Sequence, residues 1–395
     1  MSAKAPNVET ARQVEAELAE NELYAKRAER ARQGKPPELG SGLGTVASIR
    51  APDAADRDDM IAQIRAQDEL VESSTGGRFY YKPVTVDGLE LKLEPCQPSI
   101  GTIVHGIDFA QPLSPTVVRF LRELWLERRA LVFRDQGHIT REQMVTMAEY
   151  FGEVGAPFGE REHVPNSPVD LNQQIKVPGI PDMLVLPSDE DVPNAAAAYH
   201  CDATWQPRPP MGSVLMCREA PPVGGDTLFC DCYGMWAGLS KKTKERVQHL
   251  RARHEGTIGH AMDGVVPVAY HPVARTHPET GRTTLYVQQG FVRCFADDED
   301  NHLVPDVMTA EEEKMLLMEM KMQEGRPELT CRVRWEPGTV AMWDNRAVLH
   351  SASGDFWPHR RLMERLTILD SDHERRAPYY LPEAEPAAKE PSAKL

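Results

Sequence analysis

Two residues with metal-binding side chains, His200 and Asp202, lie two positions apart in the segment His200-Cys201-Asp202-Ala203-Thr204-Trp205. Alternate residues of a β-strand share a face, so a strand here would point both side chains into one cavity and Cys201 away from it. One imidazole and one carboxylate are two thirds of the 2-His-1-carboxylate set that binds non-haem Fe(II) and leaves coordination positions open. Because a His-x-Asp pair often arises by chance, the interpretation depends on a second histidine downstream.

A second histidine, His350, follows an apolar segment and a polar turn near the C-terminus. The segment predicts a strand over 339–343. Eleven residues after His350, Arg361 precedes a second predicted strand over 362–369, in which Arg365 and Thr367 alternate with apolar neighbours. A fixed cation beside a metal suits a co-substrate that chelates the metal at one end and carries a carboxylate at the other. The keto-acid 2-oxoglutarate is such a molecule.

The order and spacing of these motifs resemble the taurine dioxygenase (TauD/TfdA) family. The motifs are His200-x-Asp202, Gly224-Gly225-Asp226-Thr227, Trp343-Asp344-Asn345-Arg346 with His350 four residues on, and arginines eleven and fifteen residues after His350. The resemblance covers roughly residues 95–369. It implies an Fe(II)- and 2-oxoglutarate-dependent dioxygenase that uses O2. It also implies a mainly β fold with flanking helices (α+β), built on a double-stranded β-helix or cupin-like jelly-roll core.

Roles for individual residues follow from this resemblance. His200, Asp202 and His350 would bind the iron, and Thr227 with Arg361 would hold the distal carboxylate of 2-oxoglutarate. A threonine at the start of a strand is also common for β propensity alone.

Arg365 would face an anionic group of the substrate, as the corresponding arginine does in family members that act on sulfonates, sulfate esters and aryloxy acids. A structural ion pair with Asp355 or another acid is the alternative. Trp205 lines either the substrate side of the cavity or the core, and the sequence does not separate the two.

The resemblance also bears on the substrate. The sulfonate-binding histidine that taurine dioxygenases carry after Phe-Gly-Glu is missing, because Phe151-Gly152-Glu153 is followed by 154–157, which reads Val-Gly-Ala-Pro. Their asparagine shortly before His-x-Asp is replaced by alanines at 195–198. We therefore expect a substrate other than taurine: a small, less polar carboxylate, sulfonate or sulfate ester, hydroxylated at a C–H bond with release of succinate and CO2.

Two other classes of protein stay open. An iron enzyme that does not use 2-oxoglutarate would not need Arg361. A catalytically inactive protein on the same fold would bind Fe(II) without consuming 2-oxoglutarate.

Composition excludes several partners. The net charge of −15 argues against nucleic acid and anionic membrane surfaces. No apolar run is as long as a membrane-spanning segment, and the first residues lack the apolar core of a signal peptide, so we expect a cytoplasmic protein.

The seven cysteines are an odd number without a Cys-x-x-Cys pair, which favours reduced thiols.

The chain divides into three parts. Residues 1–78 are expected to form an N-terminal helical extension, with helices over 8–33 and 56–72 and a linker between them. Residues 79–370 would form the dioxygenase domain, and the Pro-rich tail 371–395 is expected to be disordered. The extension and the family's habit suggest a homo-oligomer.

Capping signals predict helices within the domain, starting at Ser114 with Pro115, at Thr140, at Ser240 and at Thr309. Residues 155–198, rich in Pro, Asp and Asn, are expected to be loops across the mouth of the site. Structural or surface roles are expected for four further histidines: His254, His260, His271 and His277.

Overall fold

The computed structural model describes residues 83–155, 176–177, 179–189, 198–256, 265–296 and 308–381. The predicted helices over 8–33 and 56–72 lie outside these ranges. None of the helices in the described ranges is long and apolar enough to span a membrane.

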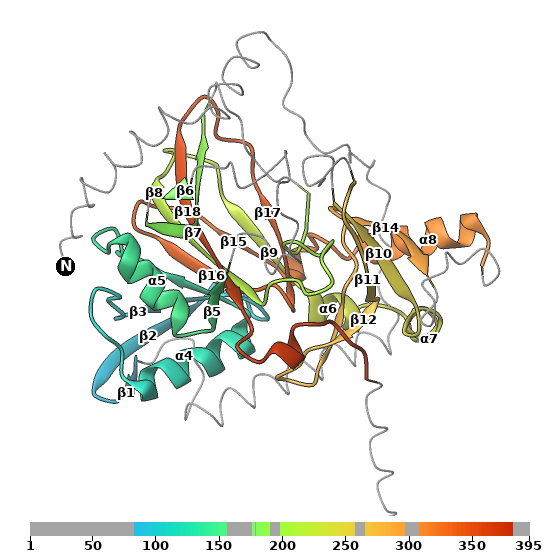
Figure 1. The fold of residues 1–395 in the computed structure, drawn as a ribbon, viewed down its shortest axis with the longest axis horizontal. Coiled ribbons are helices and arrows are strands. Elements are labelled where there is room, and N and C mark those ends of the chain that lie inside the picture. The colour runs from blue at the N-terminus through green and yellow to red at the C-terminus, as the bar shows by residue number, and fades with distance from the viewer. Residues whose placement is uncertain are drawn as a thin grey trace, which may run out of the picture.

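A ten-stranded sheet forms the centre of the molecule (Figure 1). Its strands run in the order β1-β2-β3-β4-β16-β8-β18-β7-β6, with β5 paired to β18, and β3–β4 is the one parallel pair among them. The bounds are β1 Pro83–Val86, β2 Leu89–Pro95, β3 Thr102–His105, β4 Ala130–Phe133, β5 Glu153–Gly155, β6 Lys176–Val177, β7 Ile180–Ser188, β8 Gly212–Glu219, β16 Val340–Asp344 and β18 Arg361–Leu369.

The middle strands of this sheet are buried on both faces. In β16, Val340 and Met342 pack in one hydrophobic cluster, while Ala341 and Trp343 pack in another on the opposite face. Strands β8 and β18 divide their side chains in the same way. The period-2 alternation of a strand thus decides which residues of β18 face the helices and which, including Met363, face the second sheet.

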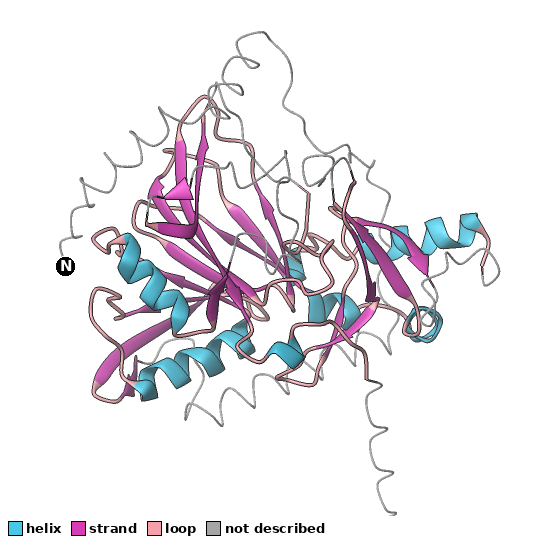
Figure 2. Cartoon of the chain, in the orientation of Figure 1, coloured by secondary structure: helices cyan, strands magenta, loops and turns pink. Residues whose placement is uncertain are grey.

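Two helices cover the first face of the large sheet (Figure 2). Helix α4, Pro115–Arg128, begins at the predicted cap, where the Ser114 side chain accepts from the backbone N–H of Val117. Helix α5, Arg141–Glu149, begins with the predicted capping box between Thr140 and Gln143. Their apolar residues, among them Trp125, pack against β8, β16 and β18.

A three-stranded sheet in the order β15-β9-β17 covers the second face. Its strands are β9 Thr227–Asp231, β15 Thr330–Val333 and β17 Val348–Ala352. Phe229 of β9 contacts Trp343 of the large sheet, with ring centroids 5.3 Å apart. Two sheets, antiparallel except for the pair β3–β4, pack face to face around an apolar interior and form the jelly-roll core that the resemblance implied.

A lobe beside the core completes the described fold. It holds the sheet β11-β10-β14 and the hairpin β12–β13, with bounds β10 Arg251–Glu255, β11 Val268–Pro272, β12 Ala274–Thr276, β13 Thr283–Leu285 and β14 Val292–Ala296. The remaining helices are α6 Cys232–Ala237, α7 Lys241–Val247, α8 Ala310–Lys321 and the short 3-10 turns η3 Pro327–Leu329 and η4 His373–Arg375. The predicted caps at Ser240 and Thr309 begin α7 and α8.

The prediction of loops over 155–198 was wrong for part of this range. Residues 180–188 form the nine-residue strand β7, which pairs with β18 from Arg361↔Ser188 to Arg365↔Leu184. The run Met183-Leu184-Val185 is fully buried. Asp182 and Pro187 flank four consecutive apolar residues, and the sequence-based interpretation gave more weight to the polar and proline-rich composition of the surrounding segment than to this short apolar run.

The ordered chain continues past the boundary predicted at residue 370. The backbone N–H of Thr276 donates to the carbonyl of Tyr379 at 2.8 Å, and the N–H of Leu381 donates to Oγ1 of Thr276 at 2.8 Å. These bonds attach residues up to 381 to β12, and residues 382–395 lie outside the described ranges.

Candidate metal centre

The two histidines meet through their backbones. His200 and His350 form an isolated antiparallel bridge, in which each N–H donates to the other residue's carbonyl at 3.0 and 2.8 Å. His350 lies in β17, whose register with β9 pairs it with Phe229. The bridge brings the two rings to a centroid distance of 4.2 Å although the residues are far apart in sequence.

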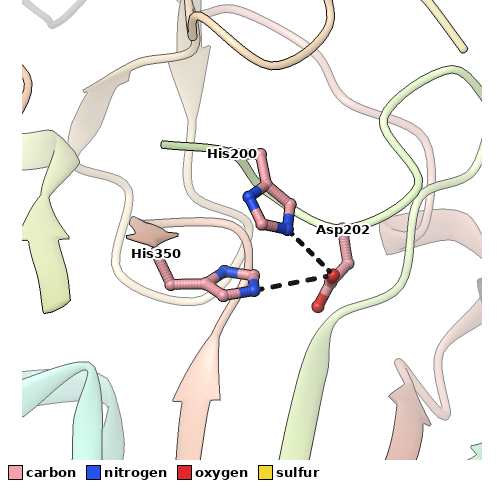
Figure 3. Close-up of side chains that lie close together, drawn as sticks. All are labelled: His200, Asp202 and His350. Carbon is pink, nitrogen blue, oxygen red and sulfur yellow. Dashed lines mark ion pairs between the residues drawn. The ribbon is translucent and has the colours of Figure 1, made fainter. Parts of the chain in front are cut away.

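Asp202 reaches the same point from a turn. The sequence-based expectation of strand alternation from His200 to Asp202 was wrong, because the chain leaves the bridge directly after His200 and residues 202–205 form a turn. Ala203 adopts a left-handed backbone conformation with φ of 49°. This turn points the carboxylate back towards the imidazoles, with Oδ1 at 3.9 Å from Nε2 of His200 and 3.7 Å from Nε2 of His350 (Figure 3).

The three side chains fit a divalent metal ion. Their ligand atoms all lie within 4.8 Å of one another, and no other such group of His, Cys, Asp or Glu occurs in the described part of the chain. Bonds of about 2.1 Å to a common ion allow two donor atoms to lie up to about 4.2 Å apart, which accommodates both His–Asp distances. Two imidazoles and one carboxylate are the donor set that non-haem Fe(II) prefers.

Burial sets the ionisation of these groups. Burial lowers the pKa of His350 to about 3, helped by the neighbouring imidazole, and it lowers the pKa of His200 as well. Burial alone would raise the pKa of Asp202, but the Arg365 guanidinium and the two imidazoles hold that pKa well below its usual range. Neutral imidazoles with free lone pairs beside an ionised carboxylate are the states that bind metal.

The orientation of His200 is fixed by its own backbone neighbour. Its Nδ1 lies 2.8 Å from the carbonyl oxygen of Ala198, which accepts the Nδ1 proton and leaves Nε2 as the electron-pair donor. His350 packs against the indole of Trp343, with centroids 4.8 Å apart. Both rings are therefore held with Nε2 towards Asp202.

The second oxygen of the Asp202 carboxylate is occupied by protein donors. Ser213 of β8 donates its hydroxyl to Oδ2 at 2.7 Å, and Nη2 of Arg365 lies 2.7 Å from the same oxygen. Behind Ser213, Nδ2 of Asn345 donates to its Oγ at 3.1 Å, and Nε1 of Trp343 donates to Oδ1 of Asn345 at 2.9 Å. Oδ1 is thereby left facing the two imidazoles.

Arg361 lies at the start of β18, as expected, and is buried, with no counter-charge in contact among the described residues. Two of its nitrogens, Nε and Nη2, are buried and have no hydrogen-bond partner in the part of the chain that the structure describes. Burial lowers the pKa of this guanidinium. Leaving donors of a buried cation unsatisfied costs free energy, so this arrangement indicates a position for an anion.

Aromatic side chains connect Arg361 to Thr227. The Arg361 guanidinium carbon lies 5.8 Å from the ring centroid of Trp335 and 5.9 Å from that of Phe356. The indole N–H of Trp335 donates to Oγ1 of Thr227, the first residue of β9, at 2.9 Å. Arg361 and Thr227, the two residues predicted to bind 2-oxoglutarate, thus both lie beside the Trp335 side chain.

Arg365 makes an ion pair, but its partner is Asp202 rather than Asp355. Asp355 instead accepts from the backbone N–H of Gly225 and lies 3.5 Å from Arg332. Since Arg361 and Arg365 are four positions apart on a strand, both share the face of β18 that points towards the second sheet.

Several residues of the centre were not predicted. Ser213 had one signal, a lone hydroxyl within the apolar run Gly212–Cys217. Gln288, whose Oε1 accepts from the backbone N–H of Cys201, had none. Trp205, whose place was left open, is buried and packs edge-on against Phe291 at 4.5 Å, and Phe291 in turn packs edge-on against His200 at 5.8 Å. It belongs to a small apolar cluster that supports the imidazole.

Three of the four further histidines singled out in the sequence, His254, His271 and His277, are buried and lie outside the triad. His277 contacts Asp344, and Nε2 of His271 lies 2.8 Å from the carbonyl oxygen of Thr204. His254 packs against His271, and His260 lies outside the described residues. All seven cysteines are free thiols, as the sequence suggested.

Comparison with known proteins gives consistent matches. The family model described as taurine catabolism dioxygenase TauD, TfdA family matches residues 92–367. The chain is 30% identical over 289 residues to an (S)-phenoxypropionate/alpha-ketoglutarate-dioxygenase of Sphingobium herbicidovorans, covering 69% of this chain and 92% of that protein. It is 27% identical over 297 residues to an alkylsulfatase of Acinetobacter baylyi, covering 71% of this chain and 85% of that protein. Among solved structures, a taurine dioxygenase from Burkholderia xenovorans is similar with a TM-score of 0.57 and 30% identity, over 71% of this chain and 91% of that one.

Proposed function

Because this chain belongs to the TauD, TfdA family of dioxygenases, we propose that His200, Asp202 and His350 bind the family's catalytic iron and that the substrate is a small organic anion. The protein is an Fe(II)- and 2-oxoglutarate-dependent dioxygenase, an oxidoreductase that uses O2. The observation that carries the residue assignment is the convergence of one carboxylate oxygen and two imidazole nitrogens on one point (Figure 3).

Iron bound there supplies the coupling of 2-oxoglutarate decarboxylation to C–H hydroxylation: one atom of O2 enters succinate, the other enters the product hydroxyl, and CO2 is released. The chain's own residues hold the participants. Ser213 and Arg365 hold Oδ2 of Asp202, which leaves Oδ1 as a single anionic ligand atom. A ligand set of three protein atoms leaves positions for a chelating keto-acid and for O2.

We propose that Arg361 and Thr227 hold the distal carboxylate of 2-oxoglutarate. A carboxylate would satisfy the buried Nε and Nη2 of Arg361, which have no hydrogen-bond partner among residues with described positions. Thr227 accepts the indole N–H of Trp335, so its hydroxyl proton is available to the same anion. The rings of Trp335 and Phe356 beside the guanidinium exclude water and strengthen the charge pairing.

Charge balance supports an anionic substrate. Asp202 contributes one negative charge, and Arg361 and Arg365 contribute one positive charge each. The Fe(II) dication and the 2-oxoglutarate dianion cancel, so the loaded centre keeps one positive charge among the described residues. A substrate monoanion would neutralise it, and we propose that it contacts the Arg365 guanidinium, whose Nη2 also holds Asp202.

The relatives favour no single anion. One is named for a phenoxypropionate, an aryloxy carboxylate, one for alkyl sulfate chemistry, and one solved structure for taurine, a sulfonate. The missing histidine after Glu153 and the alanines at 195–198 speak against taurine itself. We therefore propose a carboxylate, sulfonate or sulfate ester with a less polar body.

The test is succinate release with Fe(II), 2-oxoglutarate and ascorbate across a panel of sulfonates, sulfate esters, and aryl and alkyl carboxylates. Each anion is paired with a neutral isostere, such as the amide of the same acid. We expect one anion class to stimulate succinate formation and its isosteres to leave it at the background rate. Equal stimulation by anion and isostere would contradict the anionic substrate. If the His350→Ala variant kept both metal binding and turnover, the metal assignment would be wrong.

A further inference from the structure

A four-residue segment of the side lobe, Gln288 to Phe291, runs along the turn that carries two of the three metal-binding side chains. It forms the last part of the connection from β13 to β14 and contacts residues 199–205. The backbone N–H of Gly290 donates to the carbonyl of Tyr199 at 3.1 Å. The ring of Phe291 packs edge-on against both His200 and Trp205.

Gln288 supplies the most specific contacts of this segment. Its side chain is almost fully buried, with 1% exposure. Its Oε1 accepts from the backbone N–H of Cys201, and its Nε2 donates to Oγ1 of Thr204 at 2.7 Å. One carboxamide therefore connects the residue before Asp202 to the residue after Ala203, whose left-handed φ of 49° turns the chain.

Gly290 lies against the start of the turn, at a position where there is no room for a side chain. A Cβ on this residue would lie 2.8 Å from Cβ of His200 and 3.3 Å from the carbonyl oxygen of Tyr199. The first distance is closer than two carbon atoms approach without displacement, so any side chain here would push on His200.

The segment is itself attached to helix α8 and the residues after it. The backbone N–H of Gln289 donates to Oε1 of Glu324 at 2.8 Å, and Nζ of Lys321 donates to the carbonyl of Val292 at 2.9 Å. These two bonds, at Gln289 and at the residue directly after Phe291, hold the segment against α8 and the residues that follow it.

We infer that Gln288 and Gly290 are positioning residues that fix the separation of His200 and Asp202 before any metal binds. This inference rests on the proposed role of the triad as the metal site. Neither residue touches the ligand atoms; each acts through the backbone of the turn that carries them. A turn held in the binding geometry avoids the ordering cost that a flexible turn would incur when metal binds.

The first experiment measures Co(II) affinity of the full chain by spectroscopic titration, without 2-oxoglutarate or substrate. Gln288→Met keeps the volume of the side chain and removes both hydrogen bonds. We expect its dissociation constant to rise about tenfold or more, the size of effect typical for groups that orient metal ligands.

Gln136→Met is the matched control. Gln136 is also buried, accepts from the N–H of Phe109 at 3.0 Å and donates to the carbonyls of Ile107 and Arg134, all remote from the triad. Its replacement should lower the free energy of unfolding and leave Co(II) affinity unchanged. An unchanged affinity in Gln288→Met, or an equal loss in both variants, would overturn the inference.

Gly290→Ala tests the second residue, with Gly234→Ala as its control, because a Cβ on Gly234 would meet the Leu329 side chain instead of His200. We expect weaker Co(II) binding and an altered Co(II) absorption spectrum in Gly290→Ala alone. Unchanged binding and spectrum in Gly290→Ala would count against its positioning role.

His200→Ala separates this inference from the proposed function. If His200→Ala binds Co(II) as tightly as the parent chain, the triad is not the metal site and the proposed function fails. If His200→Ala loses binding while Gln288→Met and Gly290→Ala keep it, only the positioning inference fails.

Discussion

The hydroxyl of Ser213 donates to Oδ2 of Asp202 at 2.7 Å, while Oδ1 of the same carboxylate faces His200 and His350. The amide of Asn345 donates to the Ser213 oxygen, so the one hydroxyl proton of Ser213 is directed to Asp202. Ser213, the second residue of the apolar strand β8, therefore orients the carboxylate together with Arg365 so that Oδ1 faces the two imidazoles.

Ser213→Ala should weaken metal binding. The substitution removes a hydrogen bond to an ionised group and leaves Oδ2 of Asp202 held by Arg365 without the Ser213 hydroxyl, so we expect the metal dissociation constant to rise by about tenfold to a hundredfold. Titration with Co(II) measures this change. Ser240→Ala, which removes the cap of α7, should cost about 1 kcal/mol of stability and leave the metal affinity intact. Equal metal affinities in the two variants would refute the assignment of Ser213.

Arg361→Ala should weaken 2-oxoglutarate binding without affecting metal binding. Removing one partner of a buried charge pair costs about 2–5 kcal/mol, so we expect the KM for 2-oxoglutarate to rise at least about thirtyfold. Thr227→Val, which removes a single hydroxyl, should cost about 1 kcal/mol. Metal titration without 2-oxoglutarate is the control for both. A KM that stays at the parent value in Arg361→Ala would mean that the keto-acid binds elsewhere.

Glu364→Ala should destabilise the fold strongly. Glu364 lies on the face of β18 opposite Arg365, is fully buried, and pairs with Arg141 at 2.7 Å and Arg218 at 2.6 Å. Its removal leaves two arginines without their shared acid, which we expect to cost about 3–5 kcal/mol. Urea unfolding measures the loss. Glu245→Ala, from an exposed pair with Lys241, should change stability by less than about 1 kcal/mol.

The free energy of unfolding should fall as the pH is lowered, in part because of His277. Its Nε2 lies 3.0 Å from Oδ2 of Asp344, and its Nδ1 accepts from the backbone N–H groups of Glu279 and Thr280, each at 3.2 Å. Burial lowers its pKa from 6.5 to about 4, helped by the nearby charge of Arg346. The unfolded chain therefore takes up the proton first, so the stabilising contribution is complete above pH 6.5 and is lost as the pH falls towards 4.

The measurement is urea unfolding at several pH values between 7 and about 4.5. For His277 the slope is at most about 1.4 kcal/mol per pH unit. His277→Gln should show a shallower decline than the parent chain over this range. Identical slopes in the two proteins would show that His277 does not titrate in the expected direction.

Local signals in the sequence were sufficient to predict where helices α4 and α5 begin. The Ser114 cap and the Thr140–Gln143 capping box depend on residues within one turn of each other, so both helix starts could be predicted from the sequence alone. Strand β7 could not be predicted in this way, because its pairing partner β18 lies more than 170 residues downstream. A strand buried on both faces has no alternation to reveal it.

The sequence by itself determined the chemistry: the identities and order of His200, Asp202, His350 and Arg361 indicate a metal site with an anion beside it, because donor types follow from residue types. Only the tertiary structure decided the geometry. The backbone bridge joins His200 to His350, and the chain turns at Ala203 in a left-handed conformation. Hydrogen bonds from Ser213 and Gln288 then hold this turn from segments that are distant in sequence. Such contacts depend on which strands pair and which faces meet, and those choices minimise the free energy of the whole fold rather than of any one segment.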